Sequence, residues 1–519
     1  MPRRTAGPLT AVLLTLTLTW ASGVAVPANA ADPPPGVADL VQDLDRLLND
    51  SRLTVAKAGV VVKSAATGEQ LYGQDAGKLF APASNMKLLT SAAAVDTLGL
   101  DHRFTTSVLS TGRRSGRTLD GDLYLKGTGD PTMLAADYDA LAAKVAAAGV
   151  KVVTGRLVAD DTWFDDQRLG TDWAQDDEPY YYAAQISALT AAPDTDFDAG
   201  SVIVSVAPGP AAGAKAKVTT TPPTSHVTID NRATTGAKTD VLVTRVHGTG
   251  RILVTGTVAA RYDEWIAVDD PTGYAASLFR AALARHGVKV HGPTRRGASP
   301  ASAASVAERA SMPLGELLVP FMKLSNNIHA EILVKTMGRE VSGSGTWDAG
   351  LAVVAKFAAA AGVSMARFRD GSGLSRVDGL TPGELTAYLI ALRGKPWFRT
   401  WYDALPIAGV SDRFTGGTLR SRMAGTPAAG NVHAKTGSLT GVTGLSGYVT
   451  GADGEPLVFS VLINDYLSAS PKNLEDAIAV RLARFSRDTP ADVTTAVPLR
   501  THQQDDGDLE CSWRKPVQC

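Results

Sequence analysis

A serine and a lysine three residues apart are the first candidates for chemistry in this sequence. They lie in the stretch Pro82-Ala83-Ser84-Asn85-Met86-Lys87. A helix that begins at Ser84 would place Ser84 and Lys87 one turn apart on the same face. Serine needs an adjacent base to act as a nucleophile, and a buried lysine near another cation can lose its proton and serve as that base. The spacing therefore indicates acyl transfer, although an exposed helix-capping pattern could have the same sequence.

Two further stretches carry side chains that suit the same chemistry. Ser325-Asn326-Asn327 offers a hydroxyl that can relay a proton and a carboxamide that can donate and accept hydrogen bonds. The same three residues could also cap a helix that starts at Ile328. Lys435-Thr436-Gly437-Ser438 places a cation among hydroxyls, and Gly437 lets another backbone approach closely. Taken alone, the stretch from Lys435 to Ser438 could be a strand edge with a solvated lysine.

Apolar patterns predict the elements that must position these three stretches. Helical spacing covers residues 37–48, 88–98, 314–323, 328–337, 347–361 and about 471–485, and strand patterns cover 59–62, 70–72, 433–438, 445–450 and 457–463. Neighbouring strands joined by short turns favour an antiparallel sheet with the terminal helices stacked on one face. The serine and lysine would then lie at the start of a helix, the Ser-Asn-Asn stretch between two helices, and the Lys-Thr-Gly stretch on a strand.

The three stretches, in this order and on these elements, resemble the signature of the penicillin-recognising serine enzymes, which is Ser-x-x-Lys, Ser-x-Asn and Lys-Thr-Gly. Most of the chain is similar to D-alanyl-D-alanine carboxypeptidases and endopeptidases of the penicillin-binding protein 4 type (class C low-molecular-mass penicillin-binding proteins), particularly the actinobacterial DD-peptidases. The likeness includes residues 125–131, 370–376, 405–410 and 509–513. It implies an α/β (α+β) serine DD-peptidase/β-lactamase-like domain, with an antiparallel sheet flanked by helices and a large β-rich inserted region.

The resemblance implies roles for the residues that would carry out acylation. Ser84 would attack the carbonyl between two D-alanines, and Lys87, neutral at rest, would take its proton. Ser325 would pass a proton to the leaving amine. Asn327 would bind the substrate amide and orient Lys87.

The resemblance also assigns the Lys-Thr-Gly stretch to substrate binding. Lys435, with the hydroxyls of Thr436 and Ser438 beside Gly437, would bind the terminal carboxylate. The backbone N–H groups of Ser84 and Ser438 would form the oxyanion hole. Family members often have threonine where this chain has Ser438, so the hydroxyl is kept.

Three residues outside the signature match a pocket for the free end of a diaminopimelate side chain. Asp177 suits the amine of that group, Arg376 suits its carboxylate, and Tyr182 lines the pocket. The match is incomplete because Ala174 stands where the relatives carry a second tryptophan. The alternative is that residues 176–178 form a solvated acidic turn.

The function that the resemblance implies is cleavage of the terminal D-Ala-D-Ala bond of peptidoglycan stem peptides through an acyl-enzyme on Ser84. D-Ala-diaminopimelate cross-links are a further possible substrate, and β-lactam antibiotics would acylate the same serine. Two other functions stay open. A β-lactamase would share the acylation and add a positioned glutamate for deacylation. A non-catalytic cell-wall binding module would use the insert to hold peptidoglycan.

Both ends of the chain carry features of an exported protein. Residues 1–30 have two arginines, an apolar stretch and Ala28-Asn29-Ala30, which predicts a signal peptide cleaved near Ala30 and a secreted, extracytoplasmic protein without a transmembrane anchor. In an oxidising compartment Cys511 and Cys519 would pair and close a small loop in the C-terminal tail. The scattered histidines show no HExxH, so we expect neither a metal nor another cofactor.

Composition limits the remaining possibilities. The chain has 519 residues, a length that predicts at least two domains. Its composition, 44% hydrophobic and 20% charged residues, is typical of globular proteins. The 51 Lys and Arg nearly balance the 52 Asp and Glu, so no global charge favours nucleic acid as a partner. We expect a discontinuous catalytic domain at 31–102 plus 306–497, an inserted α+β region at 103–305 that could form two lobes, and a tail at 498–519.

Overall fold

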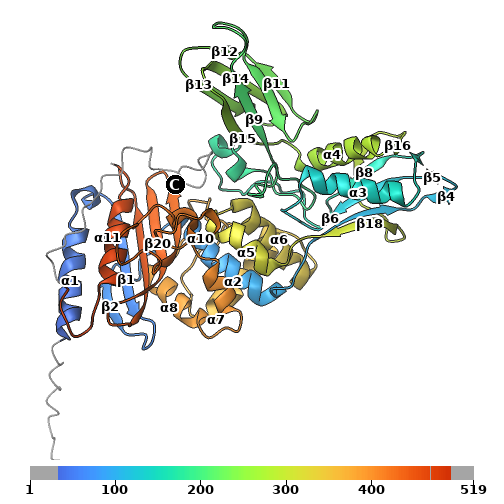
Figure 1. Ribbon diagram of the computed structural model, residues 1–519. Helices are drawn as coiled ribbons and strands as arrows, with labels where there is room; N and C mark the ends of the chain where they lie inside the picture. Colours follow the sequence, from blue (N-terminus) through green and yellow to red (C-terminus); the bar gives the residue numbers. More distant parts are fainter. Residues whose placement is uncertain (1–32, 468, 492–519) are drawn as a thin grey trace, which may run out of the picture.

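The computed structural model describes residues 33–467 and 469–491, and a five-stranded antiparallel sheet lies at the centre of its larger body (Figure 1). The strand order is β19-β20-β21-β1-β2, so β19 forms one edge of the sheet. The strands are β1 (Lys57–Ser64), β2 (Gln70–Gln74), β19 (His433–Leu439), β20 (Val442–Thr450) and β21 (Pro456–Asn464). β20 and β21 are buried on both faces, which fits the mostly apolar sequence of β21 and the small residues of β20.

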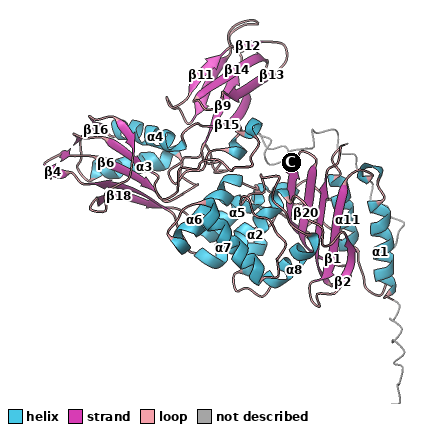
Figure 2. Ribbon diagram, turned by 180° about the vertical axis from the view of Figure 1, so that it is seen from behind, coloured by secondary structure: helices cyan, strands magenta, loops and turns pink. Residues whose placement is uncertain are grey.

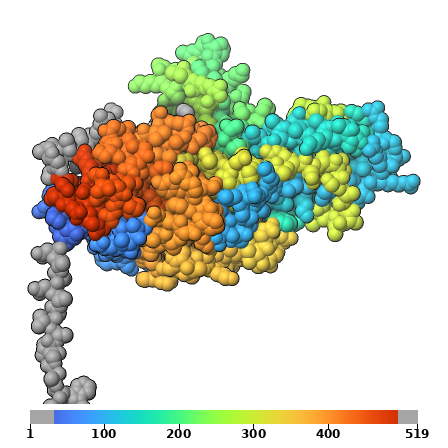
Figure 3. Space-filling model, turned by 60° about the horizontal axis from the view of Figure 1, so that its bottom comes forward, coloured from blue at the N-terminus to red at the C-terminus, as the bar shows by residue number. Residues whose placement is uncertain are grey.

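Helices cover both faces of this sheet. α1 (Pro35–Leu48) and α11 (Lys472–Ala483) lie side by side on one face, where Arg481 of α11 pairs with Asp39 and Asp43 of α1 (Figures 1 and 3). The opposite face packs against α8 (Pro382–Leu392), with the remaining helices of the body beyond it (Figure 2). The expected antiparallel sheet with both terminal helices on one face is therefore confirmed.

The helical layer beyond the sheet positions the predicted site. Its members are α2 (Met86–Leu98), α5 (Leu314–Lys323), α6 (Asn327–Ser342), α7 (Trp347–Ala360), α9 (Phe398–Asp403) and α10 (Arg413–Gly416), with the 3-10 turns η2 (Ala83–Asn85) and η5 (Gly417–Leu419). The turn η1 (Ser51–Leu53) lies on the other face of the sheet, where Arg52 donates to Asn473 of α11. Residues 86–95 of α2 are buried around the whole helix. This burial fits its Ala/Leu-rich sequence, because a helix that is apolar on all sides belongs in a core.

The chain between α2 and α5 contributes two lobes that project from this body (Figures 1 and 3). The first lobe holds α3 (Ala135–Ala147), α4 (Pro271–Arg285) and the strands β3 (Thr105–Ser110), β4 (Arg113–Ser115), β5 (Thr118–Asp120), β6 (Leu123–Gly127), β7 (Val152–Val153), β8 (Leu157–Asp160), β16 (Lys289–Val290), β17 (Thr294–Arg296) and β18 (Ala304–Ala310). The second lobe holds β9 (Ser201–Ala207), β10 (Lys217–Thr221), β11 (Thr228–Asn231), β12 (Thr234–Thr235), β13 (Asp240–Arg245), β14 (Arg251–Val258) and β15 (Tyr262–Ala267). The exact domain boundaries stay a prediction.

Three helices of the body, α8, α9 and α10, were not predicted from apolar spacing, although the sequence carries a start signal for α8. Thr381 caps α8 by accepting the backbone N–H of Glu384, and Pro382 occupies the first turn. Within the described ranges, no helix combines the length and apolar character needed to cross a bilayer. The predicted signal peptide and the predicted Cys511–Cys519 pair lie outside the described residues.

Candidate active site

Ser84 and Lys87 lie together at the start of α2, as their spacing predicts. The helix itself begins at Met86 rather than at Ser84, which belongs to the preceding turn η2. Lys87 Nζ nevertheless lies 2.8 Å from Ser84 Oγ. Both residues are buried, with Ser84 2% and Lys87 0% exposed, so the pair is not an exposed capping pattern.

Lys87 also donates to two carbonyl oxygens from other parts of the chain. One is Asn327 Oδ1 at 2.6 Å, and the other is the backbone oxygen of Ser372 at 2.8 Å. Asn327 is the first residue of α6, and its Nδ2 donates to the backbone oxygen of Tyr182 at 2.9 Å. These contacts bring together segments that are more than 200 residues apart in sequence.

The Ser-Asn-Asn stretch forms the turn between α5 and α6. Ser325 has a φ of 59°, in the left-handed region that non-glycine residues seldom adopt. The next residue, Asn326, caps α6 by accepting the backbone N–H of His329 at 3.2 Å. The capping interpretation and the proximity to Lys87 therefore hold at the same time, because different residues of the stretch provide them.

The Lys-Thr-Gly stretch lies on the edge strand β19, against the turn that carries Ser84. Lys435 Nζ donates to Ser325 Oγ at 2.8 Å, and the ammonium is fully buried. A Cβ at Gly437 would lie 2.7 Å from Asn85 Nδ2 and 2.8 Å from the backbone oxygen of Pro82. Because β19 and η2 approach so closely, only glycine fits at Gly437 without movement. The solvated-lysine alternative is wrong.

The two hydroxyls of this stretch differ in their surroundings. Thr436 Oγ1 donates to Thr418 Oγ1 of η5 at 2.8 Å. Ser438 is fully buried, yet its Oγ makes no hydrogen bond to any of the described residues. A buried hydroxyl without a protein partner is a candidate ligand group.

The loop at residues 370–375 closes the site from the other side. Gly373 has a φ of 82°, and a Cβ there would lie 1.8 Å from the backbone oxygen of Ala83. The buried carboxylate of Glu331 accepts the backbone N–H groups of Gly371 at 2.9 Å and Ser372 at 2.8 Å. Burial, followed by the nearby Asp370 carboxylate, raises the pKa of Glu331, whereas these N–H groups counteract that rise.

The three residues of the predicted side-chain pocket are near one another. Tyr182 Oη donates to Asp177 Oδ1 at 2.9 Å, and Arg376 Nη1 donates to the backbone oxygen of Thr440 at 2.7 Å. Partial burial raises the pKa of Asp177, while Tyr182 and the positive charge of Arg376 oppose this rise. The next residue, Glu178, is buried and paired with an arginine, so residues 176–178 are not simply a solvated acidic turn.

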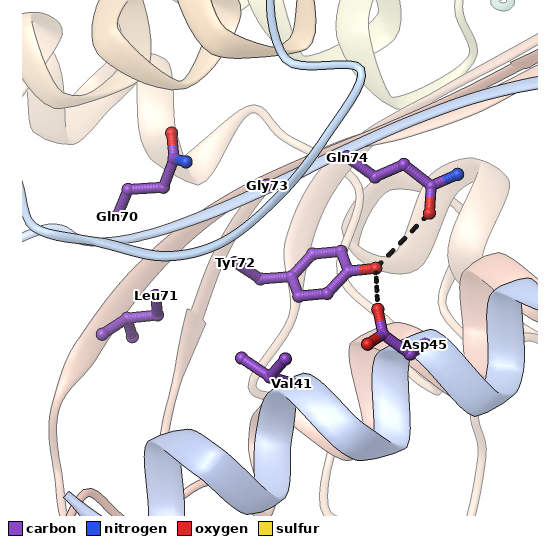
Figure 4. Close-up of a pocket in the computed structure, with 7 residues that line it drawn as sticks. All are labelled: Val41, Asp45, Gln70, Leu71, Tyr72, Gly73 and Gln74. Atoms are coloured by element: carbon purple, nitrogen blue, oxygen red, sulfur yellow. Dashed lines mark hydrogen bonds between the residues drawn. The ribbon is translucent and has the colours of Figure 1, made fainter. Parts of the chain in front are cut away.

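Of two surface cavities, one borders the candidate site and the other lies apart from it. A cavity of about 440 Å³ borders it and is lined by Arg376, Thr440, Gly441, Val442, Asp465, Tyr466 and Leu467. Another, of about 360 Å³, lies between α1 and the edge strand β2, where Tyr72 Oη donates to Asp45 Oδ1 at 2.7 Å (Figure 4). The second cavity contains none of the predicted site residues.

An acidic loop of the insert supports the Ser-Asn-Asn turn. Asp194, Asp196 and Asp198 each place a carboxylate oxygen within 4.8 Å of the others. Arg413 forms an ion pair with Asp196, and Asn326 Nδ2 donates to Asp198 Oδ1 at 3.1 Å. Protein groups thus bind part of this cluster, and the expected absence of a metal stays a prediction.

Comparisons with known proteins agree with this geometry. The family model for the D-Ala-D-Ala carboxypeptidase 3 (S13) family matches residues 40–485. The chain is 46% identical over 522 residues to a D-alanyl-D-alanine carboxypeptidase of Actinomadura sp. (strain R39), covering 98% of this chain and 96% of that protein. It is 27% identical over 441 residues to D-alanyl-D-alanine carboxypeptidase DacB of Haemophilus influenzae, covering 83% and 88%.

The fold is also found among solved structures. The crystal structure of penicillin binding protein 4 (dacB) from Haemophilus influenzae matches with a TM-score of 0.72 and 26% identity, covering 85% of this chain and 97% of that one. The fold and the serine–lysine site define a DD-peptidase-like serine enzyme. The chain belongs to the D-Ala-D-Ala carboxypeptidase 3 (S13) family and is a serine-type D-Ala-D-Ala carboxypeptidase.

Several groups at the site were not assigned a role from the sequence. They are the Ser372 carbonyl, the Tyr182 carbonyl, Thr418 and the carboxylates of Glu331 and Asp370. Backbone carbonyls carry no residue-type signal, so the first two could not be found by composition or spacing. The glycines in Asp370-Gly371-Ser372-Gly373 were the available signal, because such a run often marks a close backbone approach.

Proposed function

We propose that this carboxypeptidase is exported and cleaves peptidoglycan stem peptides through an acyl-enzyme on Ser84. β-Lactam antibiotics would acylate the same residue. The observation that carries the proposal is the set of hydrogen bonds around Lys87 Nζ, at 2.6 to 2.8 Å. The penicillin binding protein 4 of Haemophilus influenzae, which has the same fold, supports the β-lactam part.

The contacts of Lys87 support a role as the base that activates Ser84. The oxygens of Asn327 and Ser372 are carbonyl oxygens and can only accept, so they take the two N–H bonds of a neutral amine. The lone pair of that amine is then left for Ser84, whose hydroxyl can donate. The Ser84 proton moves to Lys87 Nζ as Ser84 Oγ forms its bond to the substrate carbonyl carbon.

Ser325 and Lys435 suit the second proton transfer, to the leaving amine. Ser325 Oγ accepts from Lys435 Nζ, and a hydroxyl that accepts can also donate, which suits passing a proton toward the leaving amine. Asn327 uses both ends of its carboxamide within the protein, which supports its role in orienting Lys87 more than direct binding of the substrate amide.

The edge strand β19 suits recognition of the substrate's terminal carboxylate. Its start is bridged to Ile407 through His433, but the rest of its outer side is not paired with another strand of the described central sheet, so those backbone groups can bind a peptide. The Ser438 hydroxyl, Thr436 and the buried charge of Lys435 would hold the carboxylate. The N–H groups of Ser84 and Ser438 would stabilise the oxyanion of the tetrahedral intermediate.

Asp177, Tyr182 and Arg376 would bind the free end of a diaminopimelate side chain. The acid–arginine pair complements an amine and a carboxylate, as that end requires. Cleavage of D-Ala-diaminopimelate cross-links would use the same pocket. We further propose that residues 1–30 direct export and that Cys511 and Cys519 pair after it.

Penicillin labelling of the purified mature protein tests the nucleophile. Ser84→Ala should abolish both labelling and D-alanine release while the circular dichroism spectrum stays unchanged. Ser460→Ala, at another buried serine in the central sheet, is the matched control and should be labelled normally. Labelling of the Ser84→Ala protein would move the nucleophile elsewhere, and rapid loss of the label from the wild type would favour a β-lactamase.

Product analysis tests the substrate range. The protein is incubated with a diaminopimelate-containing pentapeptide and with a cross-linked peptide dimer, and the products are identified by mass. We expect D-alanine from the pentapeptide and monomers from the dimer. An intact dimer would restrict the activity to carboxypeptidase action.

A further inference from the structure

Both carbonyl acceptors of Lys87 are held in place by one segment of the insert. Asn327 Nδ2 donates to the Tyr182 backbone oxygen at 2.9 Å. Because that contact requires the amide nitrogen, Asn327 Oδ1 must face Lys87. Tyr182 thereby fixes which end of the carboxamide meets Lys87.

The second acceptor is held through a planar peptide group. The Ser372 carbonyl, which accepts from Lys87, shares its peptide with the N–H of Gly373, and that N–H donates to Asp370 Oδ1 at 2.7 Å. Since the peptide is planar, fixing its N–H also fixes its carbonyl. Asp370 is fully buried and in turn accepts the indole N–H of Trp173 at 2.9 Å on Oδ2.

A second indole and carboxylate hold the neighbouring peptide of the same loop. Trp347 Nε1 donates to Glu331 Oε2 at 2.8 Å, and Glu331 accepts the N–H of Ser372. The rings of Trp173 and Trp347 meet edge to face, with centroids 6.2 Å apart. Two tryptophans and two buried carboxylates therefore surround the carbonyl that faces Lys87.

From these contacts we propose that Trp173 is a positioning residue for Lys87, acting through Asp370 and the Ser372 carbonyl. This inference rests on the proposed role of Lys87 as the base. Trp173 and Tyr182 flank Asp177, so the segment that would bind the substrate side chain also aligns the base. Trp173 is half-buried, and its indole N–H donates to Asp370 rather than to Ser84 or Lys87, so it is a positioning residue rather than a catalytic one.

Trp173→Phe tests the relay, because it removes the indole N–H and keeps an aromatic ring. The probe is benzylpenicillin, which lacks a diaminopimelate side chain and so does not need the pocket around Asp177. We expect the acylation rate constant at saturating benzylpenicillin to fall about 10- to 100-fold, the usual effect of a misplaced reacting group. The acid limb of its pH profile should move to lower pH, because the Ser372 carbonyl no longer favours the ammonium form. The kcat for the pentapeptide should fall in parallel.

Trp397→Phe is the matched control, because Trp397 also donates its indole N–H to a carboxylate, that of Asp96, at 3.0 Å. It should acylate at the wild-type rate. If Trp173→Phe does not fold, Trp173→Tyr replaces it, since its ring also lacks the indole N–H. Wild-type acylation by Trp173→Phe, or a raised peptide KM alone, would overturn the inference. Failure of the wild type itself to be labelled at Ser84 would instead contradict the proposed function.

Discussion

Ser325 combines a strained backbone with the contact that suits proton relay. Its φ of 59° is unfavourable for any residue with a Cβ, by about 1 kcal/mol. Its hydroxyl lies 2.8 Å from Lys435 Nζ. The surrounding turn holds this conformation, because Asn326 caps α6 and also donates to the backbone oxygen of Phe197. Strain that is kept at such a position points to a role for the side chain.

Two substitutions separate these properties. Ser325→Ala keeps the strain and removes the hydroxyl, whereas Ser325→Gly relieves the strain and also removes the hydroxyl. We expect both to slow acylation by benzylpenicillin by about 100-fold or more, as the loss of a general acid–base group does. The glycine variant should be more stable than the alanine variant by about 1 kcal/mol in urea unfolding. Acylation at the wild-type rate in either variant would exclude the relay.

At this scale, residue types and spacing were sufficient to find the reactive side chains. Ser84, Lys87, Ser325 and Lys435 lie in their predicted stretches and in direct contact as pairs. Spacing could not find the Ser372 carbonyl, because every residue has one and only the folded loop aims it at Lys87. The roles of all these groups stay predictions until the substitutions are measured.

Between elements, the critical contact is that of the edge strand β19 with the turn η2. β19 carries Lys435 and Ser438, and η2 carries Ser84, so their separation sets the width of the site. The close approach depends on Gly437, where a Cβ would come within 2.8 Å of the backbone oxygen of Pro82. Real Cβ atoms do not come so near to backbone atoms, so one element would have to move.

Gly437→Ala should therefore push β19 and η2 apart. We expect a loss of about 1 to 3 kcal/mol in unfolding free energy, typical of overpacking, and at least a tenfold slower acylation by benzylpenicillin. Gly77→Ala is the control, because a Cβ there meets no atom within 4 Å. Equal stability and acylation rates for the two variants would show that β19 and η2 are not held at this distance.

The elements were predicted well where their patterns are local. The bounds of α5 agree with the predicted range, and the strands of the central sheet lie where apolar runs indicate. The order β19-β20-β21-β1-β2 joins the two ends of the chain, and β1 pairs with β21 about 400 residues later. Such pairing depends on packing of the whole domain, so sequence patterns indicated an antiparallel sheet without its order.

Across the whole molecule, the buried His329 and the half-buried His433 connect the site to its surroundings. His329 Nε2 lies 2.9 Å from the backbone oxygen of Phe197, which belongs to the insert. The ring of His433, the first residue of β19, stacks on Tyr402 with centroids 4.3 Å apart. Burial lowers the pKa of each to about 4, and the positive charge of Lys323 adds to the effect at His433.

These shifts predict that the fold loses stability in mild acid. The unfolded chain binds protons on these histidines near the ordinary pKa of 6.5, whereas the folded chain does so only near 4. The stabilisation by neutral histidines is thus complete above about pH 6.5 and is lost as the pH falls toward 4. The measurement is the unfolding free energy in urea at several pH values between 4 and 7.5.

His433→Phe isolates one of the two contributions, because phenylalanine can stack on Tyr402 and cannot titrate. We expect its unfolding free energy to fall less than that of the wild type between pH 6.5 and 4, by about 2 kcal/mol after allowing for the solvent-exposed part of the ring. His291→Phe, at an exposed histidine, should follow the wild-type pH dependence. If His433→Phe and the wild type lose stability in parallel, the proton uptake occurs elsewhere, and the burial of His433 does not make the molecule acid-sensitive.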